Sequence, residues 1–171
     1  RYYYIALIIV VALPIIKPWG LPILTGQASQ DFYSAVEAVP DGGTIALAID
    51  YRSDSIVEIS PMVTVLYRQA FAKNIKIIMW SNVDEGANVT EPITQKVGAE
   101  LGKTYGVDWV NLGYKPGGEV TMKKMVDNFW EGAAYVDMGG TRLEQFPIMQ
   151  GFDSLKKADL LIDMMAVVPS P

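Results

Sequence analysis

The chain contains no cysteine and no histidine among its 171 residues. Disulfides, thiolate nucleophiles, Ser-His-Asp triads, histidine zinc sites and imidazole proton transfer are therefore excluded within it. Positive charge is also scarce, because 14 basic residues stand against 19 acidic ones and the net charge is −5. Binding to nucleic acid requires a basic face that neutralises phosphates, so we predict no nucleic-acid partner.

Charge is absent altogether from the first apolar run, residues 2–16, which reads YYYIALIIVVALPII. A spanning helix needs about 20 apolar residues, so this run spans a membrane only with help from its neighbours. Aromatic residues on both sides of the run suit the two interfaces of a bilayer. We therefore predict a single N-terminal membrane-anchor helix in contact with membrane lipid, represented by Tyr2, Tyr3, Tyr4, Ile8, Val11, Ile16 and Trp19.

Two other interpretations of this run stay open. Arg1 and the small residues Gly26 and Ala28, which have the spacing of a cleavage site, also fit a signal peptide that is cleaved before Ser29. A buried core helix is the third interpretation, although flanks that contain proline and glycine argue against it. Because Arg1 and Lys17 flank the run about equally, the side of the membrane is undetermined. The lack of cysteine is compatible with an extracytoplasmic domain, which we slightly favour.

Residues 1–28 form the predicted anchor and linker, and residues 29–171 are long enough for one α/β domain. Apolar runs predict strands at 44–50, 75–80, 107–112, 133–137 and within 159–168. Helices are predicted between them, starting at the capping residues Ser29, Ser60 and Thr90. This alternation indicates a three-layer, Rossmann-like fold with a mostly parallel sheet.

Such sheets bind ligands beyond the carboxyl ends of their strands. Asp50 ends the first predicted strand, Tyr51 follows it, and Asp84 lies on the next loop at the same edge. Carboxylate oxygens suit Mg²⁺, so a magnesium site is an alternative to simple solvation of these acids, and no other cofactor is predicted. Asp163, inside the last apolar run, is predicted to be partly buried and to pair with Arg52 or Lys115.

The segment at 113–119, GYKPGGE, follows a predicted strand and opens a helix. Paired glycines, a lysine and a helix N-terminus would suit a phosphate or a carboxylate. However, the segment matches neither common phosphate-binding motif, and its glutamate stands where the ligand's charge would go. A tight structural turn and a binding loop therefore stay open, and the candidate contacts are Tyr114, Lys115, Gly117, Gly118 and Glu119.

The string YGVDWVNLGYKPGGE at 105–119 resembles an uncharacterised family of prokaryotic membrane-anchored α/β proteins, as do the linker at 20–23 and the strand end at Asp50-Tyr51. The resemblance implies an N-terminal transmembrane helix and a Rossmann-like domain. It also implies that the chain continues beyond Pro171, with more α/β structure and a second hydrophobic helix. It attaches no activity and no catalytic residues.

We therefore predict a membrane-tethered α/β module that binds or assembles without catalysis. Its strand-end loops would face a protein partner or sister subunits, which makes a homo-oligomer one expected form. The alternative is a receptor or a magnesium-dependent enzyme for a small anionic ligand, using Asp50 and the loop at 113–119.

Overall fold

The computed structural model describes residues 2–16 and 25–166, and the chain divides into two compact units, residues 1–32 and 33–171. The first unit contains helix α1, Tyr2–Ile16, none of whose residues is buried. Within the described residues, no helix is both long and apolar enough to cross a membrane. The predicted spanning helix is therefore not confirmed. Trp19 and the linker at 17–24 lie outside the described residues.

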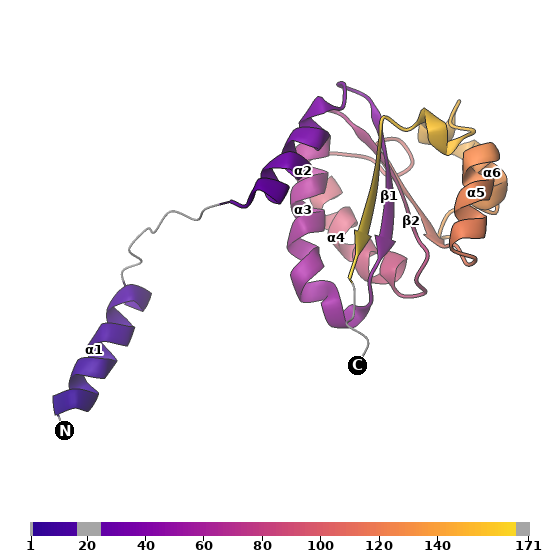
Figure 1. The fold of residues 1–171 in the computed structure, drawn as a ribbon. Helices are drawn as coiled ribbons and strands as arrows, with labels where there is room; N and C mark the ends of the chain where they lie inside the picture. The colour runs from indigo at the N-terminus through magenta and orange to yellow at the C-terminus, as the bar shows by residue number, and fades with distance from the viewer. Residues whose placement is uncertain (1, 17–24, 167–171) are drawn as a thin grey trace. The chain divides into compact units, whose positions relative to one another are not determined.

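The second unit is a Rossmann-like α/β domain built on a parallel four-stranded sheet of order β3-β2-β1-β4 (Figure 1). The strands are β1 Thr44–Asp50, β2 Lys76–Ser81, β3 Trp109–Tyr114 and β4 Leu160–Met165. Their apolar side chains bury the central strands on both faces, as the continuous hydrophobic runs predict. The α/β class and the parallel sheet are thus confirmed.

Helices cover the two faces of the sheet (Figure 1). Helices α3 (Ile56–Ala72) and α4 (Gly86–Glu100) lie on one face, where Tyr67 donates its hydroxyl to the sulfur of Met79. Helices α5 (Glu119–Asp127) and α6 (Phe129–Gly132) lie on the other, where they pack with Ala46, Ala48 and Trp80. The remaining helical elements are α2 Gln27–Ala38, η1 Ser53–Ser55, η2 Leu143–Gln145, η3 Pro147–Met149 and η4 Leu155–Lys157.

The helices begin earlier than their capping residues predict. Helix α2 begins at Gln27, α3 at Ile56 and α4 at Gly86, each before the expected cap. The Ser53–Ser55 turn runs into α3, so Pro61 lies inside that helix. Thr90 also lies inside its helix, where its hydroxyl donates to Gly86 O. Burial of Ile59 and Thr90 against the sheet outweighs the local capping preference.

The predicted strand at 133–137 is wrong. Ala134 and Tyr135 have φ angles of 56° and 61°, in the left-handed region, which an extended strand cannot accommodate. The chain instead turns and runs beside the free edge of β3, where Met138 N donates to Asn111 O at 2.8 Å. This edge of the sheet is therefore partly covered by the domain's own chain.

Candidate functional site

The carboxyl ends of the four parallel strands lie at one end of the sheet, at Asp50, Ser81, Tyr114 and Met165. Asp50 closes the loop after β2, because its carboxylate accepts Asn82 N at 2.7 Å and Asn82 Nδ2 at 2.8 Å. Both oxygens are therefore engaged by one neighbouring residue. Its role in this structure is to fix the loop.

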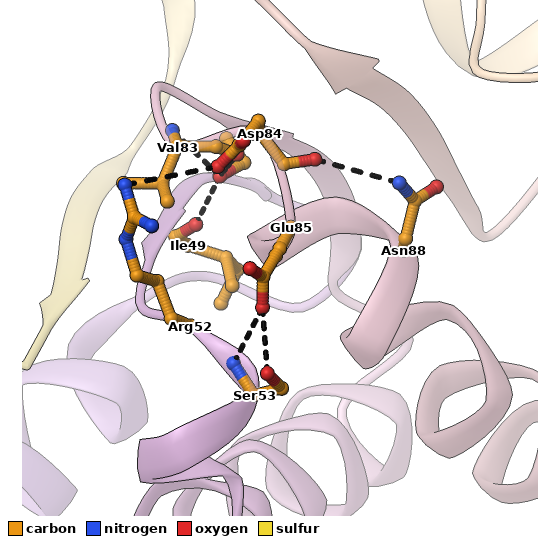
Figure 2. Close-up of polar contacts among 8 residues, drawn as sticks. Ile49, Arg52, Ser53, Val83, Asp84, Glu85 and Asn88 are labelled. Carbon is orange, nitrogen blue, oxygen red and sulfur yellow. Dashed lines mark hydrogen bonds and ion pairs between the residues drawn. The ribbon is translucent and has the colours of Figure 1, made fainter.

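The adjoining loops hold one another through short polar contacts (Figure 2). The carboxylate of Glu85 accepts the backbone N–H and the hydroxyl of Ser53, at 3.0 and 2.7 Å, and these bonds lower the Glu85 pKa. Asp84 lies 4.0 Å from Arg52, with both side chains more than 60 % exposed. Such an exposed pair contributes little to stability, on the order of 0–1 kcal/mol.

The acids at this end of the sheet do not form a cation site. Asp50, Asp84 and Glu85 each have a separate neighbour in these loops. Across residues 2–16 and 25–166, no group of three or more acidic or histidine side chains is placed to hold a metal ion. The geometry thus gives no support to the magnesium alternative.

Tyr51 and Tyr114, both predicted as contact residues, differ in exposure. Tyr51 is only 1 % exposed, and its hydroxyl shares a hydrogen bond of 2.7 Å with Thr90. Burial raises the pKa of the Tyr51 hydroxyl. Tyr114 is the last residue of β3 and is 46 % exposed. Of the two, only Tyr114 offers an accessible side chain.

The loop at 113–119 has the geometry of a tight turn. Gly117 and Gly118 have φ angles of 109° and 48°, which glycine adopts most readily. Glu119 is exposed and pairs with Lys123 on its own helix at 2.7 Å. Lys115 is 6 % exposed, and its Nζ donates to Val136 O at 3.1 Å, on the β3 edge. The only cation of the loop is therefore engaged outside it, which favours the structural interpretation.

Burial has a measurable consequence for Lys115. It lowers the pKa of the ammonium, and the nearby negative charge of Asp137 opposes that shift. The ammonium therefore lies near a group of buried polar side chains around β3. The sequence left two interpretations of Lys115 open, a ligand contact in a binding loop and a residue of a tight structural turn.

That group joins three segments far apart in sequence. Asn111, fully buried in β3, donates Nδ2 to Glu91 at 2.6 Å and to Ala87 O at 3.2 Å, and accepts Gly113 N at 2.9 Å. The hydroxyl of Tyr105 donates to Asp137 at 2.8 Å and also contacts Asn111 O. Burial, followed by this bond to Asp137, raises the Tyr105 pKa strongly. We call Glu91, Tyr105, Asn111 and Asp137 the β3 network.

Strand β4 forms the lateral edge of the sheet opposite β3, and one face of this strand is exposed. Ile162 and Met164 of β4 are buried, whereas Leu161 and Met165 are 50 % and 58 % exposed with exposed Asp163 between them. These three residues, here named the β4 surface, lie on the sheet face of Ala46 and Ala48, because Ala46 pairs with Leu161 and Ala48 with Asp163. Helices α5 and α6 cover that face over the alanines and leave it open over β4.

Comparisons of the chain with protein-family models, with curated proteins and with solved structures found no match. The resemblance of the string at 105–119 to a membrane-anchored family therefore stays a prediction.

Asp163 is paired with neither of its predicted partners, Arg52 or Lys115, within 4.0 Å. Partial burial raises its pKa, and the negative charge of Asp50 raises it further. Asp50 pairs with Met165 in register, which places the two acids diagonally on one face. The carboxyl end of β4 is consequently apolar and acidic at once.

The raised Asp163 pKa predicts how stability depends on pH. The folded state binds this proton more tightly than the unfolded state, so the contribution of Asp163 falls as pH rises from about 4 through the raised pKa. We expect Asp163→Asn to match the wild type at low pH and to be more stable at pH 7 by a few tenths of a kcal/mol, roughly 1 °C in Tm. Thermal denaturation at several pH values measures this.

The matched control is Asp41→Asn in the exposed turn before β1. It should leave Tm unchanged across the same pH range. A Tm for Asp163→Asn equal to that of the wild type at pH 7 would show that neither burial nor the charge of Asp50 disfavours the ionised Asp163 carboxylate.

Proposed function

We propose that the protein is a membrane-tethered α/β module that binds a protein partner without catalysis, and that the β4 surface is its contact. The observation that carries the proposal is the exposure of Leu161 and Met165 on a parallel sheet. Parallel sheets are normally covered on both faces, so we expect another protein surface to bury the exposed apolar face of β4.

Helix α1 supports the tether. Its 15 residues carry no charge, and no side of it is buried. A helix that is apolar all round is stable only inside another apolar medium, such as a large core or a bilayer. At 1.5 Å per residue it is about 22 Å long, shorter than the roughly 30 Å of a hydrocarbon core. The described helix would therefore need continuation through neighbouring residues, or a shallow position, to be held by lipid.

The chemistry of the β4 surface indicates the kind of partner. The outer edge of β4 has no neighbouring strand in the described sheet, so its backbone can accept an added strand. Its exposed face reads apolar, acidic, apolar, with Asp50 nearby. We infer an extended partner segment that places a basic side chain between two apolar ones.

A sister copy fits this surface less well. Antiparallel pairing of two β4 strands that sets Leu161 opposite Met165 also sets Asp163 opposite its own copy. Like charges directly opposite are destabilising in a sheet. A protein of different sequence with the complementary charge avoids that repulsion.

The strand-end loops support binding rather than catalysis. The acids at this end of the sheet engage neighbouring loops, and the lysine of the 113–119 loop engages Val136. These contacts leave few groups poised to act on a substrate at that end. They fix the loops beside the β4 surface instead.

One experiment tests the tether and the contact together. A photoreactive benzoylphenylalanine replaces Leu161 in the full chain, membranes are floated on a density gradient, and adducts are sought in the floated fraction. We expect the chain to float and to form one dominant protein adduct after irradiation. Placing the same residue at Val107, 42 % exposed and just before β3, should give none.

A second variant separates the tether from the contact. Ile9→Lys places a charge in the middle of α1, at a cost of about 3 kcal/mol for insertion into lipid, and should keep the chain from floating. Flotation of this variant would contradict the tether. Equal adducts from positions 161 and 107 would contradict the assignment of the partner contact to the β4 surface. An adduct of twice the chain's mass would show that the partner is a sister subunit.

A further inference from the structure

A hollow of about 420 Å³ lies beside the β3 network, at the sheet edge opposite the β4 surface. Glu91 and Gln95 of α4, Tyr105 and Trp109 around the start of β3, and Asp137 contribute to its lining. Its size falls within the range of small-molecule sites. None of the eight residues predicted as ligand contacts lines it.

The hollow is rich in negative charge. Glu91 and Asp137 are 8 % and 6 % exposed, and neither has an ion pair within 4.0 Å among residues 25–166. From the described part of the chain, the Glu91 carboxylate accepts hydrogen bonds from two side-chain amides, Nδ2 of Asn111 and Nε2 of Gln95. Asp137 accepts from the Tyr105 hydroxyl and from Thr141 N. Buried carboxylates normally have a cationic partner, so the hollow holds more negative charge than its neighbours balance.

The two lysines nearby do not supply that balance. Lys115 is close enough to Asp137 to feel its charge, but its Nζ donates to Val136 O. Lys103 lines the hollow, but its Nζ lies 3.6 Å from Asp108 and donates to Asn74 at 2.8 Å. Within the described residues, neither ammonium forms an ion pair with Glu91 or Asp137 within 4.0 Å.

Aromatic rings form part of the lining. Tyr105 and Trp109 meet edge to face, with ring centroids 5.7 Å apart. Trp109 is 4 % exposed and contributes its ring to the wall of the hollow. Rings beside carboxylates attract organic cations through both charge and ring quadrupole. A metal ion is a poorer match, since these residues do not assemble three acidic or histidine ligands.

The segment that brings Asp137 to the hollow is held in an unfavourable conformation. Ala134 and Tyr135, three and two residues before it, are both left-handed. Two such residues cost on the order of 1–3 kcal/mol each, which the packing around them must offset. Contacts around Asp137, and not the local backbone preference, therefore hold this residue in its position.

From these observations we propose that the hollow binds a small organic amine, whose ammonium group donates to the carboxylates of Glu91 and Asp137 beside Tyr105 and Trp109. This would give the module a small-ligand site remote from its protein contact. The site depends neither on the tether nor on the β4 surface.

The test titrates the full chain in phosphate buffer with n-butylammonium and, separately, with putrescine. A titration with sodium chloride at the same ionic strength is the control. Calorimetry should show saturable binding in the micromolar to low-millimolar range. Amide chemical shifts of the unmodified chain should change at residues 91–103 and 137–139. Absence of saturation up to about 20 mM, or shift changes elsewhere, would overturn the proposal.

Two variants provide the specificity test. Glu91→Gln should weaken binding at least about tenfold, whereas Glu100→Gln on the same helix, outside the hollow, should bind as the wild type does. Glu91 also bonds Asn111, so Glu91→Gln could weaken binding by destabilising the fold. Gln95→Lys is a second variant without this drawback, because position 95 is exposed and tolerates lysine. The new ammonium would compete with the ligand in the hollow. Undiminished amine binding by Gln95→Lys would overturn the proposal.

Discussion

Replacing Asn111 with leucine is expected to lower the free energy of unfolding by about 3–5 kcal/mol. The side chain is fully buried and is bonded to Glu91, Ala87 O and Gly113 N. Leucine fills a similar volume but offers no donor or acceptor. Three buried polar groups would then lose a partner, and each such loss costs about 1–3 kcal/mol. The sum is reduced because Glu91 keeps its bond from Gln95.

Urea denaturation followed by tryptophan fluorescence measures this loss. The control is Asn88→Leu, an exposed residue of α4 whose one weak contact is to Asp84 O at 3.4 Å (Figure 2). It should change stability by less than about 0.5 kcal/mol. A loss below about 1 kcal/mol for Asn111→Leu would mean that water or a shifted backbone replaces the network, and the β3 network could not then be rigid.

Gly86→Ala is expected to lower the free energy of unfolding by about 2–3 kcal/mol. Gly86 opens α4, and a Cβ at this position would overlap Ile49 O and Ser81 Oγ. Ile49 O belongs to the central strand, so the helix must move instead. That movement also disturbs the bonds from the Ser81 hydroxyl to Ile49 O and Val83 O. The higher helix propensity of alanine, at most about 1 kcal/mol, offsets only part of the loss.

Gly26→Ala is the matched control, because a Cβ at Gly26 meets nothing within 4 Å. The same chemical change should there be neutral within about 0.5 kcal/mol in chemical denaturation. Equal stability of the two variants would mean that α4 can retract from the strand ends without loss. In that case the loops beside the β4 surface would be less firmly held than the contacts of Asp50 and Glu85 indicate.

The sheet could be predicted from sequence because buried parallel strands are continuous apolar runs. Residues 44–50 match β1 throughout, and the runs at 75–80 and 159–168 contain most of β2 and β4. The segment at 133–137 has a similar apolar composition, but its left-handed residues leave no signal in the sequence. Helix starts were missed because packing of α3 and α4 on the sheet outweighs capping chemistry.

The candidate sites were harder to predict for a different reason. In β4 both faces are apolar apart from Asp163, so the sequence does not show that one face lacks a cover. The β3 network joins residues 91, 105, 111 and 137, which only the fold brings together. Lys115 was noticed for its glycine-rich neighbours, yet its ammonium lies on the other side of the strand end, at Val136. The roles of the β4 surface, the β3 network and Lys115 depend on where the fold places these side chains more than on their residue types.

The position of β4 beside β1 also bears on how the domain is made. Thr44 at the start of β1 bonds Asp159, which lies 115 positions later in the chain. At about 5–20 residues per second, a ribosome releases β4 roughly 6–23 s after β1. During that interval β1, one of the two central strands, has one unpaired edge, and contacts this distant in sequence form slowly. The nascent chain therefore presents an aggregation-prone edge of β1 early, and β4 is the strand that later covers that edge.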